Sequence, residues 1–246
     1  MSENNYRKWA VFYDRLQEAD YDEIGAYYHK HLIQNGADSE NKILLDLACG
    51  TGKLSRYFAD LGYDVIGADI SPEMLSEAAR KPRKNIQYLC QDMTKLDLFG
   101  TIDCCVCVLD ALNHLPDGEA VRKAFARISL FMNKGGVLVF DMNTLYKHEE
   151  ILSGKDFIIE RDSLFCAWQN SLCEKGKVDI TLDVFAFYGD VWQRYTENLS
   201  ETAYPLEEIT EMLEEAGFGN VKIYDWLSDE PANKLSEKAV FVANKM

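Results

Sequence analysis

The chain has 246 residues, and 41 acidic against 26 basic residues give it a formal net charge of −15. Hydrophobic residues make up 47% of the chain and charged residues 27%, a composition that excludes a disordered or low-complexity chain. No apolar run of about 18 residues occurs and the N-terminus is polar, so we expect no membrane span and a cytoplasmic location. The acidic balance also argues against a nucleic-acid partner, because duplex binding needs clustered lysine and arginine.

Apolar residues at helical spacing predict an interrupted helical segment from Tyr6 to Gly36, with a break near Asp20. From there the pattern alternates between short apolar runs, which fit buried parallel strands, and amphipathic helices. The helix after the second strand is expected to begin at Pro72, behind Ser71 as its N-cap. The predicted strands cover residues 43–48, 65–69, 86–90, 102–109 and 137–141, and the other predicted helices cover residues 53–61 and 120–132.

The periodicity changes after residue 143. Polar and apolar residues then alternate, and turn signals at residues 174–177 and 189–190 predict hairpins, so residues 157–199 are expected to form an antiparallel insert. A helix from Pro205 and two closing strands follow. We therefore predict one α/β domain built on a doubly wound, mostly parallel sheet of about seven strands. Its expected parts are a helical cover (1–36), a cofactor-binding core (37–143), the antiparallel insert (144–203) and a C-terminal completion of the sheet (204–246).

Seven cysteines, an odd number, indicate a reducing compartment. Cys104, Cys105 and Cys107 crowd one predicted strand, but the remaining cysteines provide no spaced second pair of the kind that zinc sites use. In a strand, Cys105 and Cys107 share one face and Cys104 points to the other. We interpret these residues as small buried hydrophobes and predict no metal site.

Gly50 and Gly52 stand where the first predicted strand meets a helix, just after the acidic residue Asp46. Glycine there permits a tight turn and lets a ligand approach the backbone. Asp69 follows Asp46 by 23 residues at the end of the second strand, and Asp92 follows Asp69 by another 23 after the third. In a doubly wound sheet these strand ends converge at the carboxyl edge, where ligands bind.

Each carboxylate has a task at such an edge. Asp69 is expected to accept hydrogen bonds from ribose hydroxyls, and Asp92 from an adenine amino group. Ile70 and Met93 would flank the adenine ring. Asp46 is expected either to orient the glycine loop or to meet a cationic ligand.

The segment from Asp46 to Gly52 resembles the first motif of the class I S-adenosylmethionine-dependent methyltransferases, and Asp69 and Asp92 match the family's ribose-binding and adenine-contacting positions. The resemblance implies methyl transfer from S-adenosyl-L-methionine. The implied cofactor-binding residues are Tyr13, Asp46, Ala48, Gly50, Gly52, Asp69, Ile70, Asp92, Met93, Leu109 and Asp110. Tyr13 belongs to an N-terminal element that covers the cofactor in small-molecule members and would contact its methionine part.

The acceptor side is expected in residues 109–116, where Leu109 and Asp110 would flank the methionine end of the cofactor. Sugar-amine and glycine N-methyltransferases are the members that the chain resembles, and the sugar-amine enzymes carry a histidine at a similar place to His114. By this resemblance His114 is our candidate acid, base or orienting residue, and the acceptor is expected to be a small molecule, with an amine favoured.

Several alternatives stay open at this point. A nicotinamide dinucleotide site is disfavoured because Ser55 replaces the third glycine of its fingerprint. A metal-dependent, catechol-type site would use Asp110, Asp141 and Asn143, but Met142 separates the last two. A non-catalytic S-adenosylmethionine-binding module and an RNA-modifying methyltransferase use the same glycine loop. The aromatic residues of the insert predict a pocket wall, a sheet core or a homodimer face.

Overall fold

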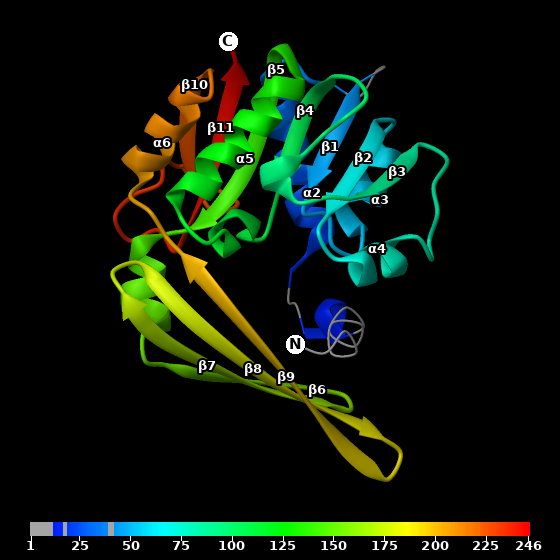
Figure 1. Cartoon of the computed structure of the whole chain (residues 1–246), viewed down its shortest axis with the longest axis vertical. Helices are drawn as coiled ribbons and strands as arrows, with labels where there is room; N and C mark the ends of the chain where they lie inside the picture. The colour runs from blue at the N-terminus through cyan, green and yellow to red at the C-terminus, as the bar shows by residue number, and fades with distance from the viewer. Residues whose placement is uncertain (1–11, 17–18, 39–41) are drawn as a thin grey trace.

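The computed structural model describes residues 12–16, 19–38 and 42–246. In this part of the chain a core sheet of seven strands has the order β10-β11-β5-β4-β1-β2-β3, with β11 antiparallel to both of its neighbours (Figure 1). This confirms the predicted mostly parallel, doubly wound sheet. Its strands are β1 (Ile43–Leu47), β2 (Asp64–Asp69), β3 (Ile86–Cys90), β4 (Ile102–Cys107), β5 (Met132–Asn143), β10 (Phe218–Asp225) and β11 (Lys238–Lys245).

Helices cover both faces of the core sheet, because the side chains of its buried strands alternate between two apolar cores. Cys104 lies in the core under α2 (Tyr21–Gln34) and α3 (Lys53–Asp60). Cys105 and Cys107 lie in the opposite core, which is covered by α5 (Gly118–Phe131) and α6 (Leu206–Glu215). The predicted facing of the three cysteines is therefore confirmed.

Two helices begin directly after residues whose side chains cap their first backbone N–H groups. Asp20 caps α2 through bonds from the backbone N–H groups of Asp22 and Glu23. The helix α4 (Pro72–Ala78) begins at Pro72, with the Ser71 hydroxyl accepting from the N–H of Met74. No helix of the described residues is long and apolar enough to cross a membrane.

The end of β4 differs from the prediction. We expected the strand to continue to residue 109, but it ends at Cys107. Leu109 and Asp110 adopt left-handed backbone conformations, with φ of 57° and 55°, so the chain turns sharply instead of extending. A short 3₁₀ helix, η2 (Ala111–His114), follows this turn and carries His114.

A small sheet with the order β6-β7-β8-β9 lies beyond the carboxyl end of β5 and is reached through a π-helical segment, η3 (Lys147–Leu152) (Figure 1). Its strands are β6 (Asp156–Arg161), β7 (Leu164–Glu174), β8 (Lys177–Tyr188) and β9 (Val191–Thr202). All its pairings are antiparallel, as predicted.

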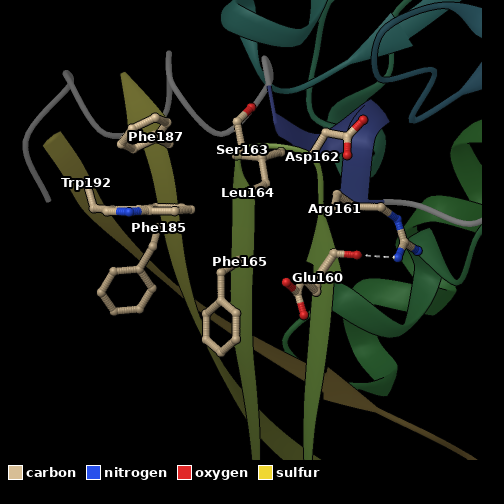
Figure 2. Close-up of a pocket in the computed structure, with 9 residues that line it drawn as sticks. All are labelled: Glu160, Arg161, Asp162, Ser163, Leu164, Phe165, Phe185, Phe187 and Trp192. Carbon is tan, nitrogen blue, oxygen red and sulfur yellow. Dashed lines mark hydrogen bonds between the residues drawn. The ribbon is translucent and has the colours of Figure 1, made fainter. Parts of the chain in front are cut away.

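The aromatic residues of the small sheet divide between its two faces. Phe157, Trp168 and Tyr195 pack against the apolar core on the inner face. On the outer face the aromatic side chains gather around an open hollow (Figure 2). They are Phe165, Phe185, Phe187 and Trp192.

A short helical segment, residues 12–16, bridges the core sheet and the small sheet. Asp14 accepts a hydrogen bond from the Thr51 hydroxyl, 2.9 Å away, in the loop after β1. On the other side, a guanidinium N–H of Arg15 donates to the carbonyl oxygen of Asp162 at 2.5 Å, and the ring of Phe12 lies 5.2 Å from that of Tyr195. The part of the predicted N-terminal helix before residue 12 lies outside the described residues.

Candidate active site

The loop after β1 is built on three left-handed residues. Ala48, Gly50 and Gly52 have φ of 57°, 52° and 71°. A Cβ on Gly52 would collide with the Tyr88 hydroxyl, so only glycine fits there. A Cβ on Gly50 would meet nothing within 4 Å, which means that this backbone borders open space where a ligand can approach.

Asp69, at the end of β2, is bonded to this glycine loop. One carboxylate oxygen accepts from the N–H of Gly50 and the other from the N–H of Ser71, both at 2.8 Å. Burial raises the pKa of Asp69, while the backbone N–H groups oppose that change. Each oxygen keeps a second lone pair, so the carboxylate can fix the loop and still accept from a ligand hydroxyl.

Beside Asp69 lies a cavity of about 550 Å³ that we call the edge cavity, because it opens at the carboxyl ends of β2 and β3. Asp92 lines it and caps η1 (Met93–Lys95), where the backbone N–H and the hydroxyl of Thr94 donate to one carboxylate oxygen. These bonds lower the pKa of Asp92. The edge cavity brings together five of the predicted cofactor-binding residues, namely Ala48, Asp69, Ile70, Asp92 and Met93.

Asp46 is buried beneath the glycine loop and has one unsatisfied oxygen. The Ser55 hydroxyl donates to Oδ2 at 2.5 Å, whereas Oδ1 has no hydrogen-bond partner among the described residues. Burial raises the pKa of Asp46 to about 7. The carboxylate lines a small cavity of about 30 Å³, the loop cavity, together with Tyr13, Gly50 and Leu109. An unpartnered buried carboxylate oxygen suits a cationic ligand group.

The turn after β4 is held by a second buried acid, Asp141 of β5. The N–H of Leu109 donates to Asp141 Oδ2 at 2.8 Å, and the N–H of Asp110 donates to Oδ1 at 2.7 Å. The Tyr28 hydroxyl also donates to Oδ2 at 2.6 Å. These bonds stabilise two non-glycine residues in a conformation that costs roughly 1–2 kcal/mol each.

Lys238, at the start of β11, joins this group of acids. Its Nζ lies 2.6 Å from Oδ1 of Asp110 and 3.2 Å from Oδ1 of Asp141. Burial alone would raise the pKa of Asp110, but the ammonium of Lys238 holds it down to about 2. The same two carboxylates raise the pKa of Lys238 although burial opposes this.

Asp110, Asp141 and Asn143, the residues of the metal-dependent alternative, already contact donor or cationic groups of the protein. The oxygens of Asp141 already accept from Tyr28, the two turn amides and Lys238. Asp110, His114 and Glu201 do place one potential ligand atom each within 4.8 Å of one another. The ammonium of Lys238, however, already supplies the cation at Asp110.

A third cavity of about 240 Å³, the inner cavity, lies between the turn after β4 and the small sheet. One side of it is polar and is formed by Asp110, His114, Asn143, Lys147, Glu201 and Lys238. The other side is largely apolar and is formed by Leu16, Leu152, Ile159, Cys166, Trp168, Ile180, Leu182 and Leu199. Burying apolar surface beside a few polar groups is the usual arrangement of small-molecule sites.

The three cavities adjoin one another at four predicted site residues, of which Ala48 lines both the edge cavity and the loop cavity. His114 lines both the edge cavity and the inner cavity. Tyr13 and Leu109 line both the loop cavity and the inner cavity. A ligand that fills the edge and loop cavities would therefore meet a second ligand in the inner cavity at His114, Tyr13 and Leu109.

The sequence reasoning missed half of the polar side of the inner cavity. Lys147, Glu201 and Lys238 come from η3, β9 and β11, and no motif marks them. One signal was available for Glu201. In a strand with alternating faces its side chain lies on the same buried face as Leu199, and an acidic residue is unusual there.

Comparison with known proteins agrees with this geometry. Residues 44–136 match a family model described as "Methyltransferase domain". A putative methyltransferase from Geobacillus sp. (strain WCH70) is 32% identical, over 98% of this chain and 99% of that protein.

Solved structures share the whole architecture. A S-adenosylmethionine-dependent methyltransferase from Clostridium acetobutylicum superposes with a TM-score of 0.86 at 29% identity, covering 97% of this chain and 98% of the other. A sugar N-methyltransferase from Streptoalloteichus sp. shares the fold with a TM-score of 0.80 at 20% identity, covering 96% and 92%. The chain therefore belongs to the class I S-adenosylmethionine-dependent methyltransferases, and S-adenosylmethionine is its cofactor.

Proposed function

We propose that this methyltransferase transfers the methyl group to the nitrogen of a small amine bound in the inner cavity. The observation that carries the proposal is the position of His114, Tyr13 and Leu109, which line the inner cavity and also its neighbours. An acceptor in the inner cavity would meet the cofactor there. The name of the Streptoalloteichus structure, a sugar N-methyltransferase, agrees with nitrogen as the methylated atom.

Features of the loop and edge cavities fit S-adenosylmethionine. The space beside Gly50 admits a ligand, and the unpartnered Oδ1 of Asp46 suits the cationic methionine end. In our assignment Asp69 accepts from the ribose hydroxyls and Asp92 from the adenine amino group, with Ile70 and Met93 on the two sides of the ring. When bound, the cofactor supplies an electrophilic methyl group.

The remaining work falls to the residues of the inner cavity. They hold the acceptor nitrogen in line with the bond that breaks and exclude water, and orientation of this kind can lower a barrier by roughly 7–11 kcal/mol. An amine that arrives protonated must lose a proton before its lone pair can react. We assign that proton to the imidazole of His114, which borders both ligands.

The size and polarity of the inner cavity narrow the acceptor class. Liquid water occupies about 30 Å³ per molecule, so the volume of 240 Å³ equals roughly eight waters and suits an acceptor of about ten non-hydrogen atoms. The apolar wall, with Trp168 and Leu182 among its members, favours an amine that carries a hydrocarbon or aromatic body. Glycine would leave this wall without a partner.

The test is mass spectrometry of the purified protein for bound cofactor, followed by an acceptor screen monitored by homocysteine release. The screen pairs phenethylamine, tryptamine and cyclohexylamine with glycine and with transfer RNA. We expect turnover with at least one of the apolar amines and none with glycine. Cofactor binding without turnover on any amine or hydroxyl acceptor would favour a binding module, and turnover on RNA alone would contradict the small-molecule assignment.

We also propose that the outer face of the small sheet pairs two copies of the chain, and that the enzyme is cytoplasmic. Phe187 and Trp192 are 39% and 55% exposed there and line the hollow together with Phe165 and Phe185 (Figure 2). A cluster of exposed aromatic side chains on one face suits a two-fold interface, in which the same patch of each copy packs against the other. We expect a dimer by light scattering and a monomer for Trp192→Ser. A monomeric wild type would contradict this.

The cytoplasmic location agrees with seven free cysteines.

A further inference from the structure

Behind His114 lies a buried group that the assignment above leaves unused. Glu201 of β9 is 5% exposed, and its Oε2 accepts from Nδ2 of Asn143 at 2.9 Å and lies 3.2 Å from Nε2 of His148. His148 of η3 is fully buried. The other oxygen of Glu201, Oε1, faces Nε2 of His114 at 3.9 Å, a distance for an ion pair and too long for a hydrogen bond.

The hydrogen bonds fix which atoms carry protons. Nδ1 of His148 lies 2.8 Å from the carbonyl oxygen of Gly176, which can only accept, so Nδ1 carries a proton. A neutral His148 would then present a bare lone pair at Nε2 to the oxygen of Glu201. The Asn143 amide cannot relieve this clash, because its oxygen accepts from Lys147 Nζ at 2.9 Å and its NH₂ therefore faces Glu201. A proton must lie between His148 and Glu201.

The surrounding charges indicate where that proton belongs. The polar side of the inner cavity and the layer behind it hold the carboxylates of Asp110, Asp141 and Glu201. The ammonium groups of Lys147 and Lys238 supply two positive charges against these three negative ones. A protonated His148 supplies the third, and a buried layer with balanced charges avoids the cost of an uncompensated ion.

We propose that His148 is a buried imidazolium paired with an ionised Glu201, and that Glu201 is the positioning residue for His114. The role in catalysis, which rests on the proposed amine methylation, follows from the geometry. The acceptor ammonium gives its proton to the imidazole of His114, so the N–H bond of the acceptor is replaced by an N–H bond of the imidazole and the nitrogen lone pair becomes free to react. Oε1 of Glu201 then faces a charged His114 and stabilises it. A charge-balanced site also does not favour the ammonium form of the acceptor.

Nitrogen NMR tests the pairing without any acceptor. The chain has four histidines, so a protein labelled with ¹⁵N-histidine gives four assignable ring systems. At pH 7.5 we expect one ring with protons on both nitrogens, and we expect its signals to vanish in His148→Gln. In Glu201→Gln the same ring should become the neutral Nδ1–H tautomer, and the signals of His114 should shift. If His148→Gln does not fold, the signals of His148 can be assigned by elimination, with variants of His29, His31 and His114.

Glu197→Gln is the matched control, because Glu197 lies on the same strand and is similarly buried, at 6% exposed. It should leave the ring of His148 unchanged. A neutral His148 in the wild type, or a doubly protonated ring that persists in Glu201→Gln, would overturn the proposal. Calorimetry with S-adenosylmethionine separates a failure of the His148–Glu201 pairing from a failure of the proposed function. Glu201→Gln should keep the wild-type affinity for S-adenosylmethionine within about twofold.

Discussion

Replacing Lys238 with methionine tests the electrostatic arrangement that holds the turn after β4. The substitution keeps an unbranched side chain, one atom shorter, but removes the cation that contacts the partly buried Asp110 and the fully buried Asp141. In the wild type the pKa of Asp110 lies at about 2 instead of 3.8, and that gap corresponds to about 2 kcal/mol of stability from this one group. Asp141 would lose a partner as well, and removing one member of a buried ion pair costs roughly 3–5 kcal/mol.

Urea unfolding at pH 7.5, followed by far-UV circular dichroism, measures this loss. We expect Lys238→Met to lower the free energy of unfolding by about 3–5 kcal/mol. The control, Lys245→Met on the same strand, should cost at most about 1 kcal/mol, because that ammonium contacts a neutral hydroxyl and the face of an aromatic ring. A loss below about 1 kcal/mol in Lys238→Met would refute the reasoning.

The pH dependence of stability tests the same ion pair of Lys238 and Asp110 independently. Because the folded-state pKa of Asp110 is lowered, its contribution is complete above the unfolded value of 3.8 and disappears as the pH falls through about 2. Wild-type stability should therefore fall over this interval. In Lys238→Met burial is opposed only by the attraction of Lys147 and His114, so this part of the acid dependence should shrink.

Two further predictions concern the glycine loop and the acid beneath it. Gly50→Val should weaken S-adenosylmethionine binding more than tenfold in calorimetry, because the valine side chain enters the space beside the loop. The control Gly135→Val, which has the same left-handed strain and equal room, should leave the affinity unchanged. Equal affinities of the two variants would contradict the placement of the loop. Because burial raises the pKa of Asp46 to about 7, the side chain gains its negative charge as the pH rises from 6 to 7.5. Affinity for the cationic cofactor should therefore increase over that range in the wild type and stay constant in Asp46→Asn. Parallel pH profiles of the two proteins would remove Asp46 from the site.

The cofactor side of the site was predictable because its residues follow from local sequence. Asp46 and Asp69 end adjacent parallel strands, and Asp92 follows the next one, so the sheet itself brings the three to one edge. Apolar runs, caps and turn residues fixed most strands and helices for the same reason. The carboxylate of Asp46 was expected to orient the loop or meet a cation, and its bond to Ser55 and its unpartnered oxygen explain why both roles were plausible.

Residues 109–116 were predicted for the acceptor side, but the rest of the proposed acceptor side was not predictable, because it depends on contacts between distant segments. Lys238 reaches Asp110 across 128 residues, and His148 reaches Glu201 across 53. The early end of β4 at Cys107 has the same origin, since Asp141 stabilises the left-handed turn through bonds that only the folded sheet provides. A pattern read along the chain carries no sign of such pairs.

Calorimetric titration with S-adenosylmethionine of the wild type and of Asp69→Ala tests the assignment of the carboxyl edge most directly. In our account the loss of the carboxylate removes the ribose acceptor, one bond to the glycine loop and one bond from the N–H of Ser71. We therefore expect affinity to fall by about 1–3 kcal/mol, or roughly 5- to 150-fold, with one cofactor per chain in the wild type. An unchanged dissociation constant in Asp69→Ala would contradict the account.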